Sequence, residues 1–173
     1  TGNTVLGETA LDASVSGTDN TAIGKNALTA LTSGASNTAL GSSALAANTT
    51  ASNNTAIGKD ALLSNTTGTN LHAFGAFALD ANTTGSNNIA VGFALSDNTT
   101  GTNNNAFGLN SLGANTTGIN NSAFGHDSMQ RSTTGNYNVA VGSQALDHNT
   151  TASNNTAVGY NSLTANTTGA TNT

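Results

Sequence analysis

Apolar residues recur along the chain in two short groups per unit, separated by polar stretches rich in Asn, Thr and Gly. The first group is an Ala followed by a large apolar residue and a Gly, as in Ala56, Ile57 and Gly58, and the second is centred on a Leu, as in Leu62. Neither group reaches the length of a stable helix, whereas short apolar segments bounded by Gly, Asn, Thr and Ser are typical of strands joined by turns. The pattern therefore predicts two short strands per unit.

The Gly that closes the first group defines a repeat. Consecutive members lie 17 residues apart, except for a step of 16 after Gly92, where a turn tolerates the deletion of one residue best. Ten such repeats predict an all-β parallel β-solenoid of about ten coils, with residues 1–173 as a single domain. At about 4.8 Å per coil, the rod would be roughly 50 Å long. The repeating Gly residues are Gly7, Gly24, Gly41, Gly58, Gly75, Gly92, Gly108, Gly125, Gly142 and Gly159.

Two polar columns accompany the apolar ones. An Asn stands four residues before the repeating Gly in every repeat except that of Leu71, and stacked Asn side chains can bond amide to amide between coils. The Asn-Thr-Thr-Gly segment, as in residues 65–68, supplies residues typical of tight turns. Its Asn residues also match the glycosylation pattern, but glycans about 4.8 Å apart would crowd one another. We therefore interpret these Asn residues as structural.

The large apolar residue before the repeating Gly forms the main candidate interaction column. Since neighbouring residues of a strand point to opposite faces, this column and the preceding Ala column cannot both face the interior. If Ala faces inward, the apolar column is an exposed stripe, and its burial at roughly 1.5 to 3 kcal/mol per side chain favours assembly. If the large residues face inward, the monomer is self-sufficient. The column comprises Leu6, Ile23, Leu40, Ile57, Phe74, Val91, Phe107, Phe124, Val141 and Val158.

Composition narrows the function further. The 173 residues include 3 Lys or Arg and 8 Asp or Glu, and a net charge of −5 disfavours nucleic acid as a partner. Cys is absent, which excludes disulfides and thiolate metal sites. We expect no membrane insertion, because no apolar run approaches about 18 residues. Few charges and no Pro also argue against disorder.

Candidate catalytic and metal-binding residues are dispersed along the repeats. His72, His126 and His148 occupy three different columns, so we predict no metal site and no cofactor. Asp80 and Asp97 form the one neighbouring acidic pair, and we interpret them as solvated turn residues. No Gly-x-Ser-x-Gly segment occurs near a His, and we predict that the protein is not an enzyme.

Regular Thr rows leave ice binding as an alternative function. A β-solenoid can present Thr ladders on a flat face, but two adjacent Thr residues give one outward row where Thr-x-Thr would give two. The row would also lose its flatness if the pair lay in a turn. The candidate ladder comprises Thr49, Thr66, Thr83, Thr99, Thr116, Thr133, Thr150 and Thr167.

The repeat resembles two families of fibrous proteins. The segments NTAIGKNAL (20–28), NTAIGKDAL (54–62) and NVAVGSQAL (138–146) are similar to head repeats of trimeric autotransporter adhesins. The longer form with NTTGSNN is similar to shaft repeats of bacteriophage tail-fibre-like proteins. The resemblance implies a left-handed parallel β-roll with three chains side by side, in an extracellular fibre on a cell or virion surface.

These observations lead to one main expectation and one secondary arrangement. We expect a structural segment of a longer fibre that provides reach, stiffness and attachment to an unknown surface receptor or matrix. Side-by-side homotrimers are the expected assembly. Subunits that stack end to end in a self-assembling filament are the secondary arrangement, since the terminal repeats match partly as neighbours: Leu163 could continue onto Leu11 and Val158 onto Leu6.

Overall fold

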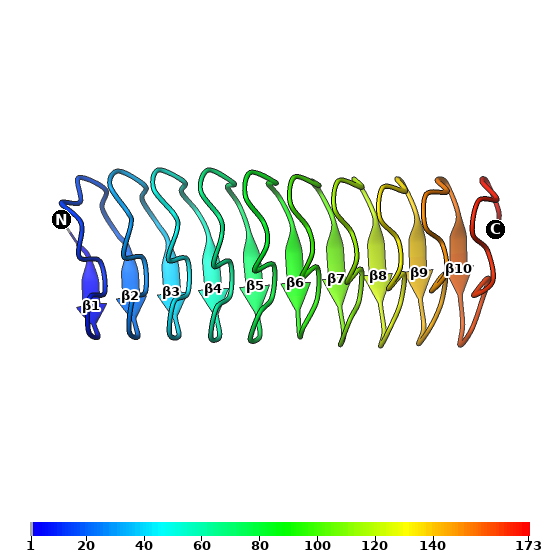
Figure 1. The fold of residues 1–173 in the computed structure, drawn as a ribbon, viewed down its shortest axis with the longest axis horizontal. Helices are drawn as coiled ribbons and strands as arrows, with labels where there is room; N and C mark the ends of the chain where they lie inside the picture. Colours follow the sequence, from blue (N-terminus) through cyan, green and yellow to red (C-terminus); the bar gives the residue numbers. More distant parts are fainter. Residues whose placement is uncertain (1) are drawn as a thin grey trace.

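A computed structural model describes residues 2–173 as an elongated parallel β-solenoid, and Thr1 lies outside the described residues. Ten strands, one per coil, form a single parallel sheet in sequence order (Figure 1). The prediction of an all-β solenoid is confirmed. The strands are β1 (Thr4–Leu6), β2 (Thr21–Ile23), β3 (Thr38–Leu40), β4 (Thr55–Ile57), β5 (His72–Phe74), β6 (Ile89–Val91), β7 (Asn105–Phe107), β8 (Ser122–Phe124), β9 (Val139–Val141) and β10 (Thr156–Val158).

The repeat period fixes the register of the sheet. Each strand pairs with the next at the same repeat position, so that Ala22 is opposite Ala39, and Ala39 is opposite Ala56. The single step of 16 residues leaves this register intact, because Ala90 still pairs with Ala106. The shortening is absorbed in the turn after Gly92, outside the strands.

The core is narrow and consists mainly of Ala and Leu. In the coil that begins with β4, the side chains of Ala56, Ala61 and Leu62 are fully buried. Equivalent Ala and Leu side chains of the other coils join them in one continuous cluster along the rod. Small residues at the inner strand position therefore allow the sheet to approach the Leu column closely.

The second apolar group does not form the strand that the sequence predicts. Asp60 and Leu62 adopt left-handed φ angles of 57° and 54°, and Ala61 donates a turn hydrogen bond to the Gly58 carbonyl at 3.4 Å. Alternating left-handed residues fold this segment into consecutive turns, which is why the prediction of a second strand is wrong. Hydrogen bonding between coils nevertheless continues here, since the Leu62 amide donates to the Ala78 carbonyl at 3.0 Å.

The repeating Gly is required by both backbone angle and packing. Gly24 has a φ of 130°, and a Cβ atom there would lie 2.5 Å from the Gly41 carbonyl oxygen of the next coil. An L-amino acid side chain would therefore meet backbone strain and a steric clash together.

Two buried Asn ladders follow the rod axis, as the stacked Asn columns predict; Leu71 interrupts the first, and the second begins at Asn48 and is interrupted at Ser132. In the first ladder, Asn138 donates from its Nδ2 to Asn121 Oδ1 at 3.1 Å and to the Ala152 carbonyl at 2.9 Å. In the second, Asn82 Nδ2 donates to Asn65 Oδ1 at 2.9 Å. Most amides of the second ladder have no exposed area, which leaves no room for glycans at those Asn-Thr-Thr positions of the folded rod.

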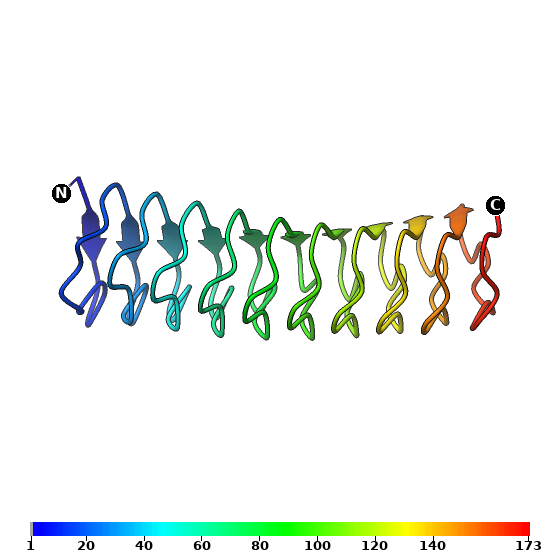
Figure 2. The same ribbon diagram turned by 90° about the horizontal axis from the view of Figure 1, so that it is seen from above.

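The strands lie along one side of the rod and the turns along the other, and the row of strands rotates gradually about the long axis (Figure 2). Such rotation is the twist expected of stacked strands. No helix among residues 2–173 has the length and apolarity needed to cross a bilayer.

Candidate assembly face

The outward side of the sheet presents two side chains per strand. In β4, Thr55 and Ile57 are half-buried at the surface, whereas Ala56 between them has no exposed area. This alternation follows from the pleat of a strand. We define the strand face as the first and third residues of β1 to β10.

The third residue of each strand carries the predicted apolar column. Its side chains are exposed or half-buried throughout, with 39% of Phe74 and 69% of Val158 exposed. The alternative in which this column fills the interior does not hold, because the Ala column occupies that space. The structure thus brings together, in one outward axial row, Leu6, Ile23, Leu40, Ile57, Phe74, Val91, Phe107, Phe124, Val141 and Val158.

Sequence reasoning did not assign the first residue of each strand to the same face. The signal was present, because a residue two positions before the apolar column must point the same way. None of these residues, and none of the apolar column, is Asp, Glu, Lys or Arg. The column formed by the first strand residues comprises Thr4, Thr21, Thr38, Thr55, His72, Ile89, Asn105, Ser122, Val139 and Thr156.

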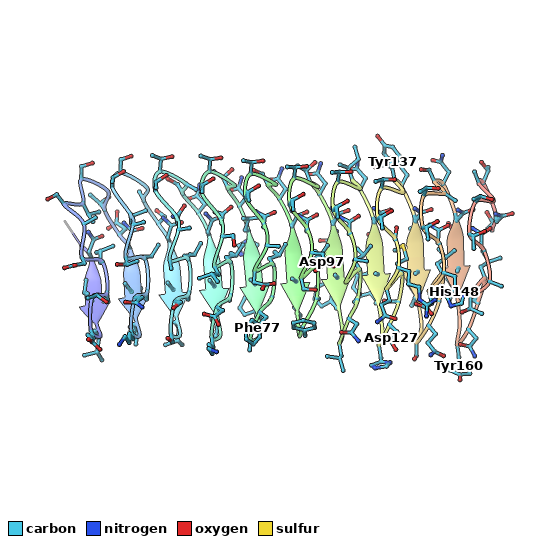
Figure 3. All side chains as sticks on the ribbon, in the orientation of Figure 1. Phe77, Asp97, Asp127, Tyr137, His148 and Tyr160 are labelled. Atoms are coloured by element: carbon cyan, nitrogen blue, oxygen red, sulfur yellow. The ribbon has the colours of Figure 1, made fainter. Side chains whose placement is uncertain are left out.

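All five Phe residues of the protein lie within residues 74–124. Phe107 and Phe124 stack on the strand face, with ring centroids 4.9 Å apart and planes inclined by 11°. Phe77 and Phe93 meet edge to face at 6.3 Å in the turn region after the strands, where Figure 3 shows Phe77 at the edge of the molecule. Phe side chains are therefore confined to the middle coils.

The Thr ladder lies in bends rather than on a strand. Thr66 is half-buried, and its Oγ1 donates to the Thr83 carbonyl of the next coil at 3.0 Å. The adjacent Thr67 is the exposed member of the pair. The inner Thr hydroxyls thus contribute to bonding between coils, and the ladder does not form a flat two-row array.

The histidines lie on three different parts of the rod. His72 is on the strand face, His126 contacts Asp127 at 3.0 Å in the turn after β8, and His148 lies 3.3 Å from Asp147 on a column away from the strands. Within residues 2–173, no three His, Asp or Glu side chains gather in a metal-binding group. The three histidines therefore do not converge on one site.

Asp80 is the one acidic residue whose protonation is clearly perturbed. Burial raises the pKa of its carboxyl above the ordinary value of 3.8, and the charge of Asp97 raises that pKa further. Its Oδ1 has no hydrogen-bond partner among residues 2–173. Asp80 therefore differs from the solvated turn residue that the sequence suggested.

No known family model matches the sequence, and neither a curated protein nor a solved structure matches it.

Proposed function

We propose that this chain is a structural segment of an extracellular fibre, in which three copies pack side by side through their strand faces. The rod provides reach and stiffness, and the proposal assigns it no enzymatic activity. The extracellular setting, on a cell or virion surface, follows from the resemblance of the repeat to adhesin heads and tail-fibre shafts.

The observation that carries the proposal is the unbroken outward column of large apolar residues. Monomeric proteins rarely leave a contiguous apolar stripe in water. Each side chain that becomes buried contributes roughly 1.5 to 3 kcal/mol at full burial, and these side chains are already partly covered. Even a fraction of that value, summed over a column present in all ten strands, favours association.

Stiffness follows from the bonding between coils. Axial hydrogen bonds occur in the strands, in the Leu segment and in the Thr bends, for example from the Thr66 amide to the Thr83 carbonyl at 2.9 Å. The two Asn ladders add side-chain bonds inside the rod. Bending the rod would strain bonds on every side of each coil, which suits a spacer.

Axial stacking is the secondary arrangement. Leu6 and Val158 are 68% and 69% exposed, so the outermost coils leave their edges uncovered. A further coil, in the same chain or in another copy, would cover these edges by the same bonding that joins the internal coils. A surface receptor or matrix would then contact the walls of the fibre.

A charge placed in the apolar column tests the proposal. Ile57→Glu would place three carboxylates at one level of a trimer, and we expect the variant to dissociate to monomers at micromolar concentration while retaining its β circular dichroism. The matched control is Thr67→Glu, an exposed position in the same coil, which we expect to leave the assembly intact. Equal masses for both variants and the parent protein would contradict the proposal.

A further inference from the structure

Side-by-side packing of a repetitive rod does not by itself determine the axial register between two copies. Because consecutive coils present similar side chains, a neighbouring copy displaced by one coil, about 4.8 Å, would meet nearly the same surface. In β1 to β4 the apolar column alternates between Leu and Ile, and these residues have the same volume. This part of the strand face therefore does not distinguish one axial register from the next.

The apolar column of β5 to β8 breaks this repetition. Its members are Phe74, Val91, Phe107 and Phe124, a sequence of one large, one small and two large side chains. The Phe107 and Phe124 rings stack in parallel on the strand face, and 40% of Phe124 remains exposed. The pattern occurs once along the rod, so it marks a unique level.

We infer that Phe74, Phe107 and Phe124 set the axial register between copies of this chain, an inference that rests on the side-by-side assembly proposed above. When parallel copies are in register, Phe meets Phe at all three levels. A shift of one coil leaves only Phe107 against Phe124, and places Phe74 against Val91 and Phe124 against Val141. Shifts of two or three coils also retain a single Phe-to-Phe level, between Phe74 and Phe107 or between Phe74 and Phe124.

The composition and area of the strand face fit a second copy of this chain better than an unrelated partner. It carries no Asp, Glu, Lys or Arg to pair with a charged partner. A side chain of aromatic size offers about 200 Å², so the two fifths exposed at Phe74 and at Phe124 amount to roughly 80 Å² each. The other side chains of the two columns each expose a smaller area. Summed over both columns and over the equal face of the second copy, the buried area reaches the order of 1,000 Å² that a specific interface needs.

Cysteine cross-linking tests the register directly, because the natural chain contains no Cys. Ser122→Cys and Val139→Cys place thiols at equivalent strand positions one coil apart. The two single-Cys proteins, one of them carrying a mass tag, are mixed, co-assembled and oxidised. We expect disulfides between two copies of Ser122→Cys to exceed mixed Ser122→Cys with Val139→Cys disulfides by at least about tenfold.

The same disulfide yields are then measured in proteins that also carry Phe74→Val, Phe107→Val and Phe124→Val. These substitutions make the apolar column of β5 to β10 uniformly Val. We expect the selectivity to fall several-fold while the assembly persists, because the first strand residues, from His72 to Val139, still differ from coil to coil. Phe77→Val is the matched control, because Phe77 lies in the turn outside the strand face, and it should retain the parental selectivity.

Three results would overturn the inference. Equal yields of like and mixed disulfides in the parental background would show that the assembly has no fixed register. Unchanged selectivity in the triple Val background would assign the register to other residues. A monomeric parent protein, identified separately by its mass before oxidation, would remove the assembly on which the inference rests.

Discussion

Asn37 donates two hydrogen bonds to the same atom of Asn20 in the preceding coil. Its backbone N–H and its side-chain Nδ2 each lie 3.0 Å from Asn20 Oδ1. The same Nδ2 also donates to the Ala51 carbonyl at 2.9 Å. One side chain thus joins the start of its own strand to the coil before it and to the turn after it, which explains how a core of small apolar residues suffices for an ordered rod.

Removal of one Asn from this ladder should destabilise the protein strongly. Asn121→Ala would leave the backbone N–H of Asn138 and the carbonyl oxygen of Gly135 without their hydrogen-bond partners in the interior. We expect a loss of about 2 to 4 kcal/mol in the free energy of unfolding, measured by denaturant titration. Thr117→Ala, at an exposed position of the preceding coil, should change it by less than about 0.5 kcal/mol. Equal losses would refute a special role for the ladder.

A pair of Gly substitutions separates backbone strain from stacking. Gly24→Ala combines a φ of 130° with a clash against the Gly41 carbonyl, whereas Gly159 has a similar φ of 123° and a Cβ there meets no atom within 4 Å. Strain alone costs about 1 to 3 kcal/mol, and we expect Gly24→Ala to exceed Gly159→Ala in thermal destabilisation. If Gly159→Ala were equally destabilising, close stacking would not be what selects Gly.

Asp80 provides a pH-dependent test. Since the pKa of its carboxyl is raised in the folded protein, protonation favours folding, and this contribution falls as the pH rises from 3.8 through the raised folded value. At pH 7 the charged carboxylate therefore opposes folding, and Asp80→Asn should raise the melting temperature by no more than about 3 °C, because the group is partly solvated.

The gain from Asp80→Asn should shrink toward zero near pH 3, where the parental carboxyl is protonated. Asp12→Asn is the control, since Asp12 holds the same repeat position but is exposed. A gain that is independent of pH would mean that the amide contributes through packing rather than through removal of a charge.

Ice binding through the Thr ladder is not expected. The ladder hydroxyls of Thr66 and Thr99 donate to carbonyls of the next coil at 3.0 Å, and they lie in bends. We predict no thermal hysteresis at millimolar concentration and no shaping of ice crystals. A clear hysteresis gap that disappears in Thr67→Lys, on the exposed row, would reinstate the ice-binding alternative.

The sequence predicted the parts of the fold that depend on periodicity. The spacing from Gly24 to Gly41 gives the coil length, and the recurrence of Asn37 and Asn54 gives the buried ladder. The conformation of Leu62 could not be predicted, because a left-handed φ is rare for Leu and is imposed here by the stacked coils.

The orientation of the strand face was left open by the sequence for a different reason. Strand alternation shows that Ala56 and Ile57 face opposite ways but not which of them faces the core. In the structure, Ala56 packs in the buried cluster with Ala61 and Leu62, and Ile57 lies on the outer face. Only the packed coil contains that information.

The mass of the protein in dilute buffer tests the central claim most directly. One chain has a mass of 16.9 kDa. Light scattering during size exclusion at micromolar concentration should give three times that mass, with an elongated elution profile. A stable monomer over the whole accessible concentration range would contradict the side-by-side trimer, and filaments of dispersed length would establish axial stacking in its place.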